Sequence, residues 1–241
     1  MSDINAKAGE LAGDIDNRFA GVARLLGDEG YSNLAAAHVM IVGIGGVGSW
    51  AAEMLARSGV GRISLVDLDD ICESNVNRQV HALSSTIGRA KVDGMADRIR
   101  QIHPGAEVNA HALYFTQSTH EGLLASPIDF VFDAIDSLRH KILLLTACRA
   151  RGIPVLVSGG AGGRLDPTQI RIDDLARSRN DRLLQKMRKQ LRSRHGFSRD
   201  PRRKFKVDCV FSTELAALPP ALDCAAGSRP ASASVKLDCE T

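Results

Sequence analysis

The residues best suited to chemistry follow one glycine-rich turn. Residues 43–48 read Gly-Ile-Gly-Gly-Val-Gly, and polar side chains follow in the order Asp67, Asn75, Arg78, Gln79, Lys91 and Asp136. Arginine and lysine bind phosphate oxygens, carboxylates bind ribose hydroxyls or Mg²⁺, and glycines let backbone amides approach a phosphate closely. These residue types after a glycine turn predict a nucleotide-binding site.

Three of these residues also have a structural explanation when each is taken singly. Arg78 suits a surface ion pair, Lys91 a solvated helix position, and Asp136 the cap of the helix that follows it. Taken together after a glycine turn, they favour two cations on the phosphates and one carboxylate on Mg²⁺.

The glycine turn lies between a predicted strand and a predicted helix. Residues 39–44 form an apolar run before it, and the helical pattern after it ends at Gly59. Residues 63–66 form a second apolar strand that ends on Asp67, where a dinucleotide-binding fold places an acid against a ribose hydroxyl. Free amides at the helix N-terminus attract phosphate. The glycines expected to lie under the phosphates are Gly43, Gly45, Gly46 and Gly48.

Apolar strands and amphipathic helices continue to residue 214. The patterns predict helices over residues 86–102, 138–150 and 181–195, and strands over residues 107–112, 128–134, 153–158, 167–172 and 207–214. Aromatic residues are sparse, so Val, Ile, Leu and Ala must form the core, as buried parallel strands require. The predicted fold is α/β, a Rossmann-like, doubly wound, mostly parallel sheet with helices on both faces.

A basic segment occupies about residues 181–206. Its helix carries an apolar stripe, and its cations continue past the helix with almost no acid among them. Such a face is often only solvated, but its continuity over two adjoining segments favours contact with a nucleic-acid backbone. The residues expected to bind RNA are Arg182, Lys186, Lys189, Arg192, Arg202, Arg203 and Lys204.

Length and composition indicate one α/β domain. The 241 residues carry a net charge of +3. We expect a flexible arm over residues 1–16, the nucleotide-binding domain over residues 17–214, and a loop or tail over residues 215–241. Residues 1–16 contain no secretion signal and the apolar run 142–148 is too short to cross a bilayer, so we expect a cytoplasmic protein without membrane association.

Two nucleotide chemistries compete for such a glycine turn. A nicotinamide dehydrogenase needs a hydride site and a crevice for a second nucleotide. An adenylating enzyme needs charges on a triphosphate, a metal ion, and room for a carboxylate to attack the α-phosphate. The additional charges of Arg78, Lys91 and Asp136 favour adenylation.

Several motifs carry a family resemblance. GIGGVGSW, LVDLDD, NVNRQ, GRAK and DAID resemble the adenylating enzymes of the ubiquitin-activating, molybdopterin and thiamine pathways. RQVHAL, the GGAGG run with LDPTQI, and DCVFSTE resemble the branch of tRNA threonylcarbamoyladenosine dehydratases. These enzymes use ATP to activate the threonyl carboxylate of the modified adenosine as an acyl adenylate, and ring closure then expels AMP.

The resemblance also implies roles for individual residues. It places Gly45 and its neighbours under the phosphates, Asp67 on the ribose, and Asn75, Arg78 and Lys91 toward the triphosphate, while Asp136 matches the metal-binding or catalytic aspartate. Cys239 matches a mobile-loop cysteine proposed for covalent or sulfur-relay roles. The implied cofactors are ATP and Mg²⁺, and the implied partners are tRNA, a second copy of the chain and a cysteine desulfurase or sulfur-acceptor system.

The chain also departs from the family pattern. A second arginine that relatives supply across a dimer corresponds to Gly21 here, and the family's glycine-rich C-terminal strand and helix have no counterpart after Cys239. Two alternative functions therefore stay open. One is adenylation of the C-terminal glycine of a ubiquitin-like sulfur carrier, which the absence of paired CxxC motifs disfavours. The other is a non-catalytic nucleotide-binding scaffold.

Overall fold

The computed structural model describes residues 3–200 and 202–217 of the chain. The helices are α1 (Asp3–Ala36), α2 (Gly48–Arg57), α3 (Lys91–Ile102), α4 (His120–Leu123), α5 (Leu138–Arg151) and α6 (Arg182–Arg194). The strands are β1 (His38–Val42), β2 (Arg62–Val66), β3 (Glu107–His111), β4 (Phe130–Asp133), β5 (Val155–Ser158), β6 (Ile170–Asp174) and β7 (Asp208–Ser212). Short 3₁₀ helices cover Glu73–Asn75, Pro167–Gln169 and Leu175–Arg177.

The seven strands form one sheet in the order β3-β2-β1-β4-β5-β7-β6. Every neighbouring pair is parallel except β6 and β7. The chain winds outward in one direction from β1 to β3 and in the other from β4 to β5, so the order reverses between β1 and β4; β7 then lies between β5 and the edge strand β6. In open α/β sheets, ligands bind outside the carboxyl ends of the strands at such a reversal. The predicted fold class is confirmed.

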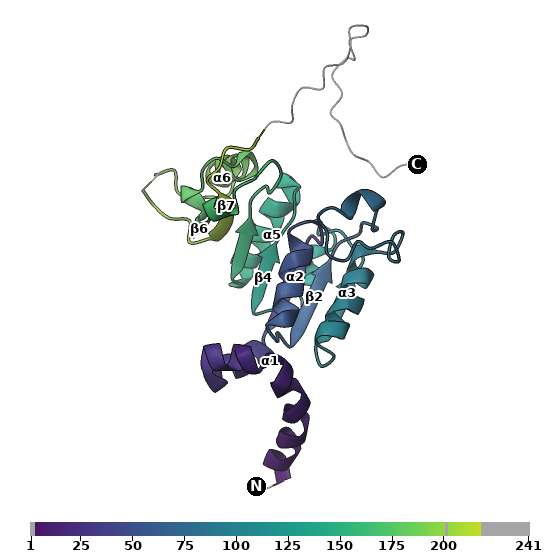
Figure 1. The fold of residues 1–241 in the computed structure, drawn as a ribbon. Coiled ribbons are helices and arrows are strands. Elements are labelled where there is room, and N and C mark those ends of the chain that lie inside the picture. Colours follow the sequence, from purple (N-terminus) through teal and green to yellow (C-terminus); the bar gives the residue numbers. More distant parts are fainter. Residues whose placement is uncertain (1–2, 201, 218–241) are drawn as a thin grey trace.

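Helices cover both faces of the sheet (Figure 1). Val39 and Ile41 of β1 pack with α2 and α3, whereas Met40 and Val42 pack with α5 on the opposite face. This alternation follows from the two-residue period of a strand whose two faces are both buried. The apolar stripe of α6 packs beside α5 against β5 and β7. The basic face of α6 is therefore left toward solvent.

The third helix begins later than predicted. Residues 86–90 form turns instead of the start of a helix, because the backbone there pairs with the segment after β2. Ile71 N donates to Arg89 O, and Gly88, with φ of 84°, donates its N–H to Ile71 O. Lys91 consequently stands at the first helical position of α3, next to the polar loop rather than a full turn into the helix.

Residues 3–16 form the first part of α1, which extends away from the sheet (Figure 1). That these residues are a flexible arm stays a prediction. The predicted strand 167–172 is instead a 3₁₀ turn followed by β6, since Asp166 caps the turn by accepting from Thr168 N. Within the described residues, no helix is long and apolar enough to cross a membrane.

Candidate nucleotide and catalytic site

The glycine turn between β1 and α2 is tightly packed on one side and open on the other. A Cβ on Gly48 would lie 1.8 Å from Gly43 O, and one on Gly43 would lie 2.7 Å from Ala134 O. A Cβ on Gly45 would meet no described atom within 4 Å. Gly43 and Gly48 are thus required by the local packing, whereas the space over Gly45 lies open beside the N-terminus of α2, where amides favour an anion.

Asp67 fixes the turn from the end of β2. Its Oδ2 accepts from Ile44 N at 2.6 Å and its Oδ1 accepts from Asp69 N at 2.9 Å. Burial raises the pKa of Asp67, and the two backbone hydrogen bonds oppose that rise. Each carboxylate oxygen keeps a second lone pair, so the side chain can hold the turn and still accept from a ribose hydroxyl.

Lys91 is held near the end of β2 by Asp69, which Tyr114 holds in turn, and neither of these two residues was predicted to belong to the site. Its buried ammonium lies 2.7 Å from Asp69 Oδ2, and Tyr114 OH donates to Asp69 Oδ1 at 2.7 Å. The hydrogen bond to Asp69 raises the pKa of Tyr114 to about 12, with smaller contributions from burial and from the charges of Asp69, Asp67 and Asp136. The LVDLDD motif was the available signal for Asp69, but no local pattern pointed to Tyr114.

Arg78 lies over the glycine turn. The position of a Cβ on Gly46 is 3.4 Å from Arg78 Cγ, and the guanidinium Nη1 donates to Ser74 O and Asn77 Oδ1, both at 2.9 Å. Trp50 on α2 donates to Arg78 O at 3.0 Å. Among the described residues no carboxylate pairs with Arg78, so the surface ion pair weighed above is not formed and the guanidinium is available for a phosphate.

Asn75 and Gln79 have different surroundings although both are buried. Asn75 Oδ1 accepts from Cys72 N at 3.1 Å, which closes the 3₁₀ turn that leads to Arg78. Gln79 Oε1 has no hydrogen-bond partner within the described part of the chain. Asn75 therefore shapes the loop, and Gln79 retains a buried acceptor.

Asp136 is exposed three residues after β4, and α5 has no side-chain cap hydrogen bond. The capping role weighed above is therefore absent. Asp133, at the end of β4, positions this loop: its Oδ1 accepts from Ile135 N at 3.1 Å and from Lys141 Nζ at 2.8 Å. Asp133 and Lys141 are both fully buried. Burial raises the pKa of Asp133, and the Lys141 ammonium opposes that rise.

These elements meet at the reversal between β1 and β4. The glycine turn touches the Asp136 loop through the approach of Gly43 to Ala134 O, Arg78 covers Gly46, and the charges of Asp67, Asp69 and Asp136 all act on Tyr114. The described residues contain no cluster of three or more His, Cys, Asp or Glu side chains able to hold a metal. A single exposed carboxylate fits a Mg²⁺ ion that is bound mainly by nucleotide phosphates.

Comparison with known proteins assigns the family. The model of the ThiF family matches residues 17–218. The chain belongs to the ThiF family. Its relatives include the tRNA threonylcarbamoyladenosine dehydratases of Escherichia coli and Haemophilus influenzae. The first is 48% identical over 202 residues, which are 84% of this chain and 75% of that protein, and the second is 45% identical over 203 residues, 83% and 78%.

Solved structures of the Escherichia coli dehydratase resemble this ThiF-family chain closely. The complex with ATP has a TM-score of 0.82 at 47% identity, covering 85% of this chain and 84% of that one. The complex with AMP has a TM-score of 0.82 at 46% identity, covering 86% and 85%.

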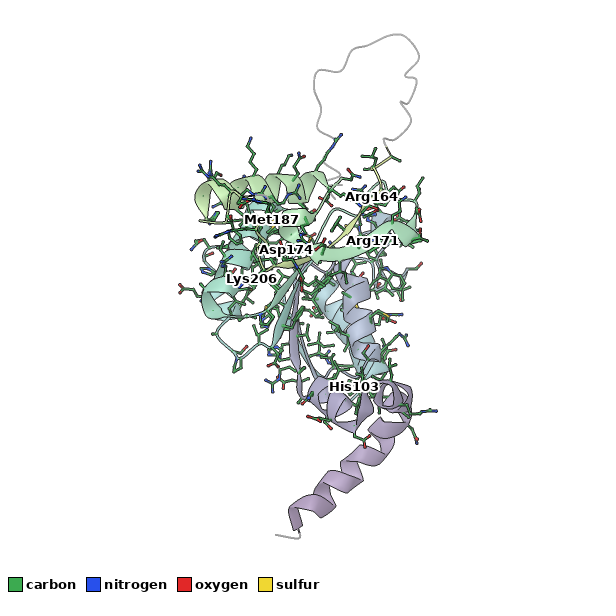
Figure 2. All side chains as sticks on the ribbon, turned by 90° about the vertical axis from the view of Figure 1, so that its left-hand side faces the viewer. His103, Arg164, Arg171, Asp174, Met187 and Lys206 are labelled. Atoms are coloured by element: carbon green, nitrogen blue, oxygen red, sulfur yellow. The ribbon has the colours of Figure 1, made fainter. Side chains whose placement is uncertain are left out.

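Some of the residues expected to bind RNA form no ion pair with described acidic side chains, whereas others already contact described residues. Arg182, Lys186, Lys189, Arg203 and Lys204 are exposed and form no ion pair with a described carboxylate. Arg192 is half-buried with its guanidinium 5.0 Å from the centroid of the Phe205 ring, and Arg202 pairs with Asp200 at 3.2 Å. Figure 2 shows basic side chains projecting outward from α6, with Met187 on its inner side. Cys239 lies outside the described residues.

Two arginines near Gly21, Arg18 and Arg24, lie at the opposite end of the sheet from the glycine turn. Arg18 Nη1 donates to Ile102 O at 2.9 Å, where α3 leads into β3, and Arg24 Nε donates to Ala20 O at 3.3 Å. Both side chains are therefore directed away from the nucleotide site of their own chain.

His81 is a buried residue of this ThiF protein that the sequence did not single out. It is 1% exposed, and neither ring nitrogen has a partner in the described structure. Burial, aided by the charges of Lys91 and Arg98, lowers its pKa to about 4. The folded protein therefore holds the imidazole neutral, three residues after Arg78.

The lowered pKa of His81 makes the stability of the folded protein depend on pH. Because the unfolded chain binds a proton to His81 near pH 6.5 and the folded chain does not, stability should fall as pH decreases from about 6.5 to about 4, by at most roughly 3 kcal/mol. Urea unfolding of the wild type and of His81→Leu across this range measures the difference. Exposed His195→Leu is the control; equal pH slopes for wild type and His81→Leu would contradict the assignment.

Proposed function

We propose that this ThiF-family protein is an ATP-dependent tRNA threonylcarbamoyladenosine dehydratase. Its support is the combination of the open glycine turn with Arg78, Lys91 and Asp136 at one sheet reversal. The same fold recurs at 47% identity in a dehydratase solved with ATP. A dehydrogenase is disfavoured because these charges surround the phosphate end of the site.

The proposed reaction has two steps. A carboxylate oxygen of the threonyl group attacks the α-phosphorus of ATP, which forms an acyl adenylate and releases pyrophosphate. A nucleophilic atom of the carbamoyl group in the same modified nucleoside then attacks the acyl carbon, the ring closes and AMP leaves. The formal loss of one water from the nucleoside is thereby coupled to conversion of ATP into AMP and pyrophosphate.

The chain's residues would stabilise the charges in the first step. Amides at the start of α2 and the open space over Gly45 receive a phosphate, and Asp67 holds the ribose. Arg78 is free to approach the departing pyrophosphate, while Lys91, held by Asp69, contributes a fixed positive charge. Asp136 would hold Mg²⁺, which neutralises phosphate charge when it is bound.

A turnover experiment tests this function. The purified protein is incubated with ATP and tRNA that carries threonylcarbamoyladenosine, and the digested nucleosides are weighed by mass spectrometry. We expect AMP, pyrophosphate and a nucleoside lighter by one water. AMP formation that depends on a carrier protein with a C-terminal glycine would favour the sulfur-carrier alternative, and ATP binding without turnover on either substrate would favour a scaffold.

Substitutions at two glycines of the turn should separate the effect on ATP binding from the effect on stability. Gly45→Ala should leave the unfolding temperature unchanged, because its Cβ meets no described atom within 4 Å, yet weaken ATP binding about tenfold by occupying the space of a phosphate. Gly48→Ala should instead lower the unfolding temperature, because its Cβ would overlap Gly43 O. Calorimetric ATP titration and thermal unfolding measure both; a Gly45→Ala variant with unchanged ATP affinity would refute the phosphate position.

Three finer features belong to the same proposal. We expect a homodimer, supported by Trp50 and Met54, two neighbouring apolar side chains on α2 that are 51% and 61% exposed. A cytoplasmic location is a second expectation, which no contact in the structure addresses. A cysteine desulfurase or sulfur-acceptor partner stays a prediction that depends on Cys239, outside the described residues.

A further inference from the structure

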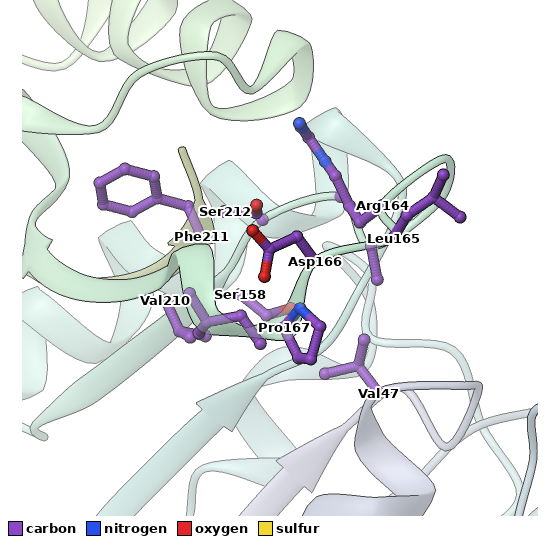
Figure 3. Close-up of a pocket in the computed structure, with 13 residues that line it drawn as sticks. Val47, Ser158, Arg164, Leu165, Asp166, Pro167, Val210, Phe211 and Ser212 are labelled. Atoms are coloured by element: carbon purple, nitrogen blue, oxygen red, sulfur yellow. The ribbon is translucent and has the colours of Figure 1, made fainter. Parts of the chain in front are cut away.

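Two pockets adjoin at Gly160 and Arg164, and the first of them reaches the glycine turn. The first, of about 330 Å³, opens at the carboxyl ends of β5 and β7; its apolar lining includes Pro167, Ile170, Val210 and Phe211, and it reaches Val47 of the turn (Figure 3). The second, of about 610 Å³, lies between residues 160–164 and the start of α6. Both pockets are lined by Gly160 and Arg164, so they adjoin at these residues; we call the two together the hollow, with the first pocket as its apolar half and the second as its basic half.

The second pocket is strongly basic. Its charged lining consists of Arg164, Arg179, Arg182, Arg188 and Asp181. Both oxygens of Asp181 are already occupied, Oδ1 by Leu184 N and Oδ2 by Gly160 N, each at 2.8 Å. Across the described residues none of the four arginines forms an ion pair. The pocket therefore has an excess of three positive charges and no acid free to neutralise them.

Arg164 carries guanidinium donors that no group in the described part of the chain satisfies. Its Nη2 donates to Asn180 O at 2.7 Å, which fixes the guanidinium. Its Nε and Nη1 are buried and have no partner in the described part of the chain. Figure 3 shows the side chain directed away from Val47, out of the apolar half. Buried guanidinium donors left unpaired are unfavourable, and the planar fork matches an oxyanion.

Arg188, on α6, lines the same pocket and is a second arginine available to an anion there. It donates to Ser178 Oγ, which holds it half-buried at the pocket. Arg179 and Arg182 are exposed and make no hydrogen bond among the described residues, so they can move onto a bound anion. One hydrogen-bonded and two exposed arginines thus line the same pocket as Arg164.

We infer that this basic pocket, formed by Arg164, Arg179, Arg182 and Arg188, binds a backbone phosphate of the RNA strand next to the nucleoside that the enzyme modifies. The inference rests on the proposed function. A base in the apolar half would lie beside Val47 and hence beside the amides at the start of α2 that are expected to hold a phosphate of ATP. The strand that carries this base has a phosphate on each side of it, and the basic half of the hollow receives one of them.

The test uses the full chain and a synthetic anticodon stem-loop carrying threonylcarbamoyladenosine. Its affinity is measured by fluorescence anisotropy over a range of salt concentrations. Each phosphate that flanks the modified nucleoside is replaced in turn by an uncharged methylphosphonate. One of the two replacements should weaken binding to the wild type about tenfold, and the salt slope should fall by roughly 0.7.

Arg164→Gln should weaken binding of the unmodified backbone by a similar factor and should show no further loss with the methylphosphonate. Arg164→Lys, which keeps the charge but loses the fork, should be intermediate. Arg177→Gln, two positions from Arg179 and outside the pocket lining, is the matched control and should bind within twofold of the wild type. The KM for tRNA should rise in Arg164→Gln while the KM for ATP stays unchanged, which separates an RNA phosphate from an ATP phosphate.

The outcomes distinguish the inference from the function on which it rests. If neither methylphosphonate weakens wild-type binding, or if its effect adds fully to that of Arg164→Gln, the pocket does not hold a backbone phosphate, even when the enzyme turns over. A rise in the KM for ATP would assign the pocket to the nucleotide instead. If the binding pattern holds but the wild type forms no AMP, the phosphate site stands and the dehydratase function is wrong.

Discussion

Asp136→Asn is expected to reduce ATP-dependent AMP formation at least about 100-fold, the loss typical of removing one charge-stabilising group from an active site. The amide has nearly the same shape as the carboxylate but has no charge to bind Mg²⁺. Asp136 is exposed and its side chain caps no helix. The unfolding temperature should therefore be unchanged, because surface substitutions of this kind alter stability by less than about 0.5 kcal/mol.

The measurement is the release of AMP and pyrophosphate under single-turnover conditions, with tRNA that carries the modified nucleoside. Asp93→Asn is the matched control, since Asp93 is an exposed aspartate on α3 with no part in the site. Turnover by Asp136→Asn within tenfold of the wild type would remove Asp136 from the catalytic assignment. Loss of turnover in Asp93→Asn as well would show that the assay reports stability rather than chemistry.

Lys141→Met should destabilise the fold by about 3–5 kcal/mol, the range for breaking a buried ion pair from one side. Lys141 and Asp133 are both fully buried with Nζ and Oδ1 2.8 Å apart, so the substitution leaves a carboxylate in an apolar interior. Burial then keeps the pKa of Asp133 above its unfolded value without an opposing charge. The folded variant binds that proton more tightly than the unfolded chain, so its stability should be greater at low pH and fall as pH rises through the folded pKa.

Urea unfolding at pH 5 and pH 8 measures this effect against exposed Lys186→Met as the control. The double variant Asp133→Leu/Lys141→Met should be more stable than Lys141→Met alone, because it removes the unpaired charge together with its partner. A double variant no more stable than the single one would show that Lys141 contributes packing rather than charge compensation.

Features that depend on residues close together in the chain could be predicted from the sequence, whereas features that depend on contacts between distant residues could not. The sheet class and the order of elements depend on local periodicity, and the strand, glycine turn, helix and terminal aspartate are all contiguous in the chain. The start of α3 was predicted too early because the pairing of Ile71 with residues 88–89 overrides helical propensity. Whether Arg78, Lys91 and Asp136 act together was a prediction from their order alone.

The residues that hold the site residues in position could not be predicted from the sequence, because their contacts and their burial depend on the tertiary structure. Tyr114 meets Asp69 across 45 residues, and the charged pair of Asp133 and Lys141 resembles a solvated pair until the burial of both is known. The four arginines of the basic pocket come from two segments, and only the fold shows that they lack acidic partners. Such contacts depend on tertiary packing, which no periodic pattern encodes.

The approach of Gly43 to Ala134 has a consequence for how the protein becomes competent. β1 and β4 are neighbours in space, but the chain returns to β4 only after completing β2 and β3, so neither half of the sheet alone presents a finished cradle for a nucleotide. Affinity for ATP and completion of the tertiary structure are thereby thermodynamically linked, and saturating nucleotide should shift the whole unfolding transition upward by mass action. Newly synthesised chains would acquire the capacity to adenylate only once both halves have docked.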